Sequence, residues 1–248
     1  MKRWMIVLSL FCVLFTLSTE TKAQWQNGNL AVRTNGNNFQ SGDQLKIEII
    51  ALDLILEPFY TQVSYSYSVQ VEKKDDDGNL VKKTETRTID RKAGPVIESM
   101  EKLQSVVLDD TFHFGEGTPE GVITAAVTVY ARGSKSKLSV IKSEAIYGED
   151  TGKAAKLQLH GLKRANAETW LTFDGVFIEG GRYTALILNG NKIITQIEVG
   201  VYPSGHNELN ISSTQLSGTA GKTFDILIHD HDHSYSSTLA RVAIPSTP

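Results

Sequence analysis

Short runs in which apolar and polar residues alternate are the feature that most limits the fold of this chain. The clearest run spans residues 64–72, where Tyr65, Tyr67, Val69 and Val71 occupy every second position. Alternate side chains of a β-strand point to the same face, so this run predicts a strand with one apolar and one polar face. Similar runs recur between Gly, Asn, Asp and Pro residues, which is typical of an all-β fold.

The chain of 248 residues is long enough for two β-sandwiches of about 100 residues each. A polar stretch at 148–153 lacks apolar periodicity and separates two series of runs. The candidate strands after it are 157–159, 169–173, 183–188, 192–199, 208–211, 222–228 and 238–244. We therefore predict an all-β chain with two immunoglobulin-like β-sandwich domains in tandem, at 24–147 and 148–248.

Two features interrupt the first series of runs. An Asp-Gly pair at 77–78 predicts a hairpin between the alternating run and a polar strand at 80–89. After Pro95, apolar residues fall at Val96, Ile97, Met100, Leu103, Val106 and Val107. Pro favours the first turn of a helix, and this spacing favours a short helix that crosses between the sheets.

The first 23 residues have the pattern of a cleaved signal peptide. Lys2 and Arg3 provide a positive start, residues 4–18 form an apolar run, and Ala23 is a small residue at the expected cleavage site. Removal changes the formal net charge from −3 to about −5, because three cations and one anion lie in this segment. We predict a secreted protein, in the periplasm, at the cell surface or outside the cell.

The signal also contains Cys12, the only cysteine of the chain. The secreted form therefore cannot contain a disulfide or a thiolate metal site. Its mild acidic excess, without basic clusters, argues against a nucleic-acid partner. No later run approaches the roughly 20 apolar residues that a membrane-spanning helix needs, so no membrane insertion is expected after cleavage.

Four short motifs mark the second half of the chain. They lie at 171–181, 187–190, 210–216 and 224–228. Gly175 permits a bend, Phe177 provides a core anchor, and Asn189-Gly190 closes a hairpin. Together they resemble an IPT/TIG domain, an immunoglobulin-like family, over 156–245, although the proline-rich entry usual before its first strand is missing. The resemblance implies a module that binds, spaces or scaffolds, often in bacterial surface proteins, and it brings no catalytic residues.

The first half offers a more general likeness. Residues 39–45 place Gly42-Asp43 at a turn before an alternating strand. This opening is similar to that of macroglobulin-type and other bacterial extracellular β-sandwiches. It implies the fold class only.

The densest group of metal-ligating side chains is the run at 229–233. On an extended strand, His229, His231 and His233 share one face, and neutral imidazoles suit zinc, copper or nickel. Same-face residues lie nearly 7 Å apart, so a shared metal requires the segment to bend. The alternative, which we favour, is a solvated polar loop between the last two strands. His113, His160 and His206 are isolated in the sequence, which indicates exposed or locally hydrogen-bonded histidines rather than general bases.

Aromatic residues provide a second candidate site, a platform that stacks on sugars. Its candidates are Trp25, Phe59, Tyr60, Tyr65, Tyr67 and Trp170. A buried sheet face explains the alternation around Tyr65 equally well, and we favour core positions.

No motif of a catalytic nucleophile or a phosphate-binding loop is found in the sequence. We therefore predict a non-enzymatic binding, adhesion or scaffolding protein with a protein or glycan partner and no cofactor. Two alternatives remain: a carbohydrate-binding module, or a metal-dependent hydrolase that uses the histidines of 229–233.

Overall fold

The computed structural model describes residues 30–115, 117–149, 155–165, 168–212, 214–216 and 221–244. The predicted signal peptide lies outside the described residues. Every regular element within them is a β-strand, so the predicted all-β class is confirmed. The first eight strands are β1 (Leu30–Thr34), β2 (Asn38–Phe39), β3 (Gln44–Ala51), β4 (Phe59–Lys74), β5 (Leu80–Ala93), β6 (Ser105–His113), β7 (Gly121–Ala131) and β8 (Lys137–Tyr147). The other seven are β9 (Leu157–Ala165), β10 (Glu168–Gly175), β11 (Gly181–Asn189), β12 (Lys192–Tyr202), β13 (Gly205–Ile211), β14 (Thr223–Asp230) and β15 (Tyr235–Ala243).

The first eight strands enclose one apolar core. β1, β3 and β6 form a three-stranded sheet, while β8, β7, β4 and β5 run in that order within a larger one. Alternate side chains of both sheets meet in a single buried cluster, which includes Leu45, Ile47 and Ile49 of β3. Tyr65 and Phe112 contact each other from opposite sheets, with ring centroids 4.9 Å apart. The alternating runs of the sequence thus supply the inward faces of a sandwich.

The last seven strands enclose a second core in the same way. β13, β10 and β9 form a three-stranded sheet, and β12, β11, β14 and β15 belong to the larger one. Leu171 and Phe173 of β10 and Ile226 and Ile228 of β14 all lie in one buried cluster. The opposite face of this small sheet is mainly polar, and it also carries Trp170 of β10.

The two cores are joined by continuous structure. β15 pairs in parallel with β8 and makes one nine-stranded sheet of the two larger sheets. Val32 N donates to Ser236 Oγ over 3.1 Å, and Thr34 N donates to Thr238 Oγ1 over 3.2 Å, which ties β1 to β15. A third buried cluster contains Ala31, Ile50, Leu52, Leu186, Leu188 and Leu227. We call this cluster the seam, because it takes residues from both halves. The division at 147/148 stays a prediction.

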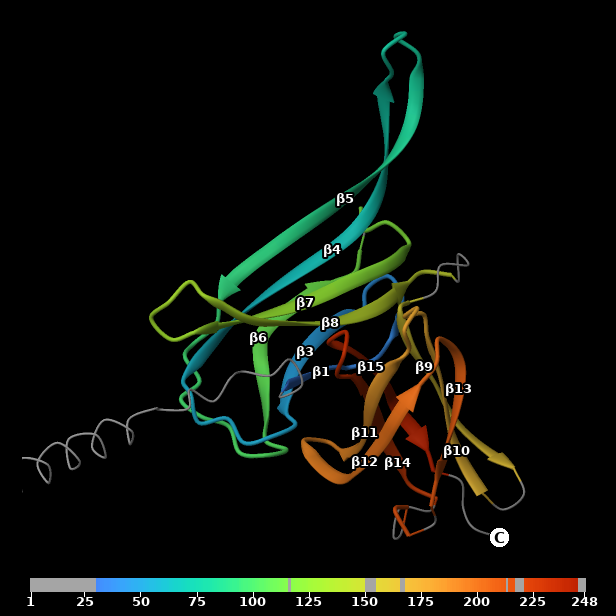
Figure 1. Cartoon of the computed structure of the whole chain (residues 1–248). Helices are drawn as coiled ribbons and strands as arrows, with labels where there is room; N and C mark the ends of the chain where they lie inside the picture. The colour runs from blue at the N-terminus through green and yellow to red at the C-terminus, as the bar shows by residue number, and fades with distance from the viewer. Residues whose placement is uncertain are drawn as a thin grey trace, which may run out of the picture.

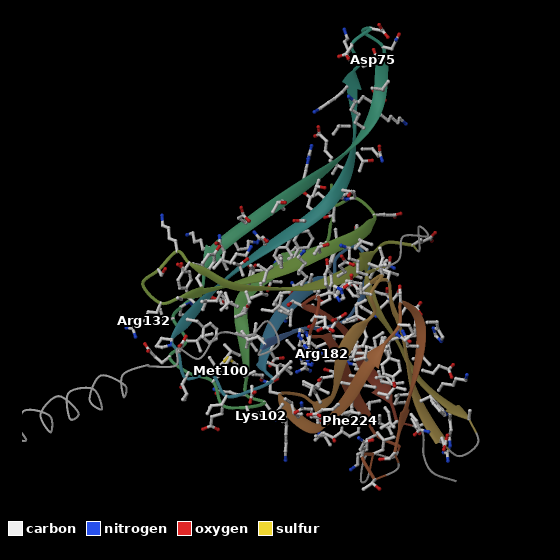
Figure 2. All side chains as sticks on the ribbon, in the orientation of Figure 1. Asp75, Met100, Lys102, Arg132, Arg182 and Phe224 are labelled. Atoms are coloured by element: carbon white, nitrogen blue, oxygen red, sulfur yellow. The ribbon has the colours of Figure 1, made fainter. Side chains whose placement is uncertain are left out.

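The hairpin of β4 and β5 extends well beyond the rest of the first half (Figure 1). β4 pairs with β7 only as far as Tyr67, whereas its pairing with β5 continues to Lys74 and Leu80. Figure 2 shows Asp75 at the far tip of this hairpin. We call residues 68–87 the arm.

The helix predicted over 95–107 is wrong. Ile97 and Met100 form isolated antiparallel bridges with residues in and before the start of β4, and β6 begins at Ser105. Leu103 has a φ of 65°, which a right-handed helix does not allow. Met100 is fully buried, so its apolar spacing reflects contacts with the sandwich core rather than one face of a helix.

Among the described residues, no helix is long and apolar enough to cross a membrane.

Candidate functional site

His229 and Asp230 form the end of β14 and are fully buried. The favoured alternative, a solvated loop, is therefore wrong for these two residues. β11 and β15 pair with β14 on either side as far as Asp230, which extends the strand past its predicted end. His229 Nδ1 lies 2.9 Å from Ser236 Oγ. Burial, together with the charge of nearby His231, lowers the pKa of His229 from 6.5 to about 3.

The other two histidines of this segment have different neighbours. His231 Nε2 lies 2.7 Å from Thr184 Oγ1. The His233 ring stacks on Phe177, with centroids 4.0 Å apart and planes 6° apart, and its Nδ1 lies 3.0 Å from Asp230 Oδ2. Among the described residues, the potential metal ligands whose donor atoms lie within 4.8 Å of one another are His160, Asp174 and His206, not these three histidines. A metal bound by His229, His231 and His233 stays a prediction that requires the segment to rearrange.

The buried His229 imidazole predicts a loss of stability at mildly acidic pH. In the unfolded chain the His229 imidazole binds a proton near pH 6.5, whereas in the folded chain it binds one only near pH 3. Between these values the unfolded state binds more protons, so the free energy of unfolding falls as the pH falls. A shift from pH 7.5 to pH 5.5 is expected to cost roughly 1 kcal/mol through this group, measured by urea unfolding at both pH values.

The His229→Gln variant should lose this part of the pH dependence. His113, an exposed histidine at the end of β6, provides the control. The His113→Gln variant should keep the wild-type difference between the two pH values. Equal pH dependence in wild type and His229→Gln would contradict the assignment.

Two of the predicted sugar-stacking residues cannot contact a ligand. Phe59 and Tyr65 are both fully buried in the first core. The preferred interpretation of these two residues as core positions is confirmed. Trp25 lies outside the described residues. A buried ring has no free face on which a sugar can stack.

The remaining aromatic candidates lie on different strands. Tyr60 of β4 stacks on Tyr130 of β7, with centroids 5.1 Å apart and planes 13° apart. Tyr67 is half-buried further along β4, and Trp170 is half-buried on β10. The five candidates that the structure describes therefore do not form one platform.

A cluster of three side chains lies on the outer face of the small sheet of the second half. Asp174 of the central strand β10 faces His206 of β13 in direct register, and Asp174 Oδ1 lies 2.7 Å from His206 Nδ1. On the other side, Asp174 Oδ2 lies 2.8 Å from His160 Nε2 of β9. One donor atom from each side chain lies within 4.8 Å of the others. The three side chains are half-exposed or exposed, so solvent reaches the cluster.

A β-bulge brings His160 to this cluster. The register between β9 and β10 shifts so that Thr172 faces Gly161 while Phe173 faces Leu159, which leaves His160 as the extra residue. Gly161 has a φ of 141°, a conformation that side chains with a Cβ rarely adopt. Bulges re-aim side chains in this way, and this one turns His160 toward Asp174.

The cluster carries a stable negative charge at its centre. Partial burial raises the pKa of Asp174, but hydrogen bonds from His160 and His206 outweigh it and hold the pKa below its usual value. A second carboxylate lies beside it: Glu208 Oε1 is 3.8 Å from His206 Nε2 and 2.9 Å from Lys163 Nζ. The site therefore presents two imidazoles around one ionised carboxylate at neutral pH.

The arm is the other distinctive surface. All residues from Ser68 to Arg87 are exposed or half-exposed. An ion pair between Lys73 and Glu85 joins its two strands, and the hydrogen bond from Lys73 lowers the pKa of Glu85. At the tip, Asp75 Oδ1 accepts from the backbone N–H groups of Asp77 and Asn79, over 3.0 Å and 2.8 Å. The predicted acidic hairpin turn is thus confirmed.

Comparisons with known proteins do not identify a family. No family model matches the chain, and no curated protein matches it. The resemblance to IPT/TIG domains therefore stays a prediction.

Solved structures offer only a distant likeness. The crystal structure of Spo0M, a sporulation control protein from Bacillus subtilis, is 9% identical with a TM-score of 0.32, over 84% of this chain and 82% of that one. The native conformation of E. coli alpha-2-macroglobulin is 9% identical with a TM-score of 0.29, over 83% of this chain and 13% of that one. TM-scores this low carry no argument about function.

Proposed function

We propose that the chain is a secreted, non-enzymatic binding or scaffolding protein that contacts a partner protein through the arm. The observation that carries the proposal is the length of the β4–β5 hairpin beyond the sandwich. Past Tyr67, β4 has lost its pairing with β7, and β5 is the last strand of the sheet. The arm therefore presents two open strand edges as well as two solvated faces.

Stability of the fold does not account for such a hairpin. A two-stranded ribbon without a packed face is marginally stable in water, and its residues gain little from burial. Open edges can pair with an added strand of a partner, a common mode of peptide recognition. Leu80 is 67% exposed near the tip and offers an apolar contact. The lysines at 73, 74, 82 and 83 protect the edges from unspecific pairing, while five acidic and five basic residues leave the arm without a formal net charge.

A shortened arm tests the proposal. Val69 and Glu85 face each other across the ribbon, so residues 70–84 can be replaced by Asn-Gly, a turn suited to two-residue hairpins. We expect the variant to fold with an unchanged thermal midpoint, because the removed residues contribute nothing to either core. Binding to the partner should be lost.

Photo-crosslinking in the producing cells measures that binding. A photoreactive residue at Leu80 should give a discrete adduct with a protein, whereas an adduct with a glycan would contradict a protein partner. The same residue at Leu56, 72% exposed in the loop before β4, provides the control and should not give it. Identical products at both positions, or an adduct that the shortened chain competes away as well as wild type does, would count against the arm as the binding surface.

A further inference from the structure

The cluster of His160, Asp174 and His206 has the composition of a metal site. We propose that these three side chains bind one divalent transition-metal ion, of which Zn²⁺ is the most suitable probe. The ion would lie on the outer face of the small sheet, above the central strand β10. This site is independent of the arm and of the histidines at 231 and 233.

The strand order supplies the geometry. Neighbouring strands lie about 4.8 Å apart, so side chains on one face of three adjacent strands can reach a common ion. Asp174 on the middle strand provides the central ligand, and a histidine on either flank provides the others. The required donor atoms already lie within 4.8 Å of one another.

Only small movements are needed to admit the ion. Ligands at about 2.0–2.1 Å around a tetrahedral zinc are separated by roughly 3.3 Å from each other. Asp174 contacts His206 through Oδ1 at 2.7 Å and His160 through Oδ2 at 2.8 Å, so each of these pairs must open by about half an ångström. A ligand pair near the 4.8 Å limit must instead close by roughly 1.5 Å. Exposed side chains can make this adjustment by rotation, without a change in the strands.

The chemistry of the donors selects the class of ion. Imidazole nitrogen suits zinc, copper, nickel and iron, whereas calcium and magnesium prefer sites made of oxygen alone. Metal ligands must be deprotonated, so the ion displaces the protons through which His160 and His206 now contact Asp174. Three protein ligands leave at least one coordination position open to solvent or to a further ligand. Glu208 lies beside His206, but its ion pair with Lys163 offsets its charge, so Asp174 supplies the negative charge that favours a cation.

Titration of the untagged chain with Zn²⁺ tests the proposal. Isothermal calorimetry should give one ion per chain. Asp174→Asn, His160→Gln and His206→Gln should each weaken binding at least tenfold, with unchanged circular dichroism. His113→Gln, on an exposed position of β6, should bind as wild type does. The variant with the shortened arm should also bind Zn²⁺ as wild type does. The metal site and the proposed function are therefore tested independently.

Cobalt provides a second readout. Co²⁺ bound in a four-coordinate site should give visible d–d absorption bands in wild type, and these should disappear in His160→Gln and His206→Gln. The proposal is overturned if wild type shows neither a heat of Zn²⁺ binding nor Co²⁺ absorption bands. It is also overturned if Asp174→Asn binds Zn²⁺ as tightly as wild type does. Loss of binding in a His231→Gln, His233→Gln double variant with retention in Asp174→Asn also overturns it, since the metal then lies in the segment at 229–233.

Discussion

The Arg33→Met variant is expected to lose about 3–5 kcal/mol in the free energy of unfolding. Arg33 of β1 forms ion pairs with Glu48 of β3, at 2.9 Å, and with Asp225 of β14. Its Nη1 also donates to the carbonyl oxygen of Gly190 over 2.7 Å. The Arg33 and Glu48 side chains are each 10% exposed, and that of Asp225 is 21% exposed. Removal of the one cation leaves two carboxylates together with little water to solvate them.

Equilibrium unfolding in urea measures this loss, and Arg132→Met provides a matched control. Arg132 Nη1 donates to both carboxylate oxygens of Glu98, over 2.9 and 2.8 Å, but both side chains are more than half exposed. An exposed ion pair contributes about 0–1 kcal/mol, so the same substitution there should have little effect. Similar small losses in both variants would mean that water screens the Arg33 cluster as well.

Local patterns in the sequence predicted most strands. The run at 64–72 lies within β4, and the hairpin predicted at Asn189-Gly190 joins β11 to β12, with Gly190 and Asn191 between the paired Asn189 and Lys192. Strand alternation and turn residues act over a few positions, so they can be identified without tertiary information. The helix predicted over 95–107 shows the limit, because apolar residues spaced by three or four also fit a segment that bridges to another strand.

The candidate metal ligands could not be predicted in the same way. His160 and His206 are 46 positions apart in the sequence, and they meet only because β9 and β13 flank β10. The position of His160 further depends on a bulge that no local pattern in the sequence indicates. By contrast, the dense run at 229–233 is conspicuous in the sequence, yet pairing of β14 with both neighbours buries its first histidine.

The Ile50→Ala variant is expected to lose about 2–5 kcal/mol in the free energy of unfolding. We expect this loss to destabilise both halves of the chain together. Ile50 of β3 is fully buried, and it belongs to the seam rather than to the core of the first half. Its neighbours there include Leu186 and Leu227, from strands of the second half. Truncation therefore leaves a cavity against both halves, and the surrounding strands can only partly collapse into it.

Fluorescence of Trp170 on β10 reports the unfolding of the second half, in a Trp25→Phe background that removes the other tryptophan expected in the secreted chain. Because the seam and the nine-stranded sheet connect the halves, we expect Ile50→Ala to shift this transition together with that seen by far-UV circular dichroism. Val107→Ala, on β6 and 60% exposed, is the control and should change stability by less than about 0.5 kcal/mol. A Trp170 transition that stays at its wild-type urea midpoint while the circular dichroism signal splits into two steps would show that the halves unfold independently.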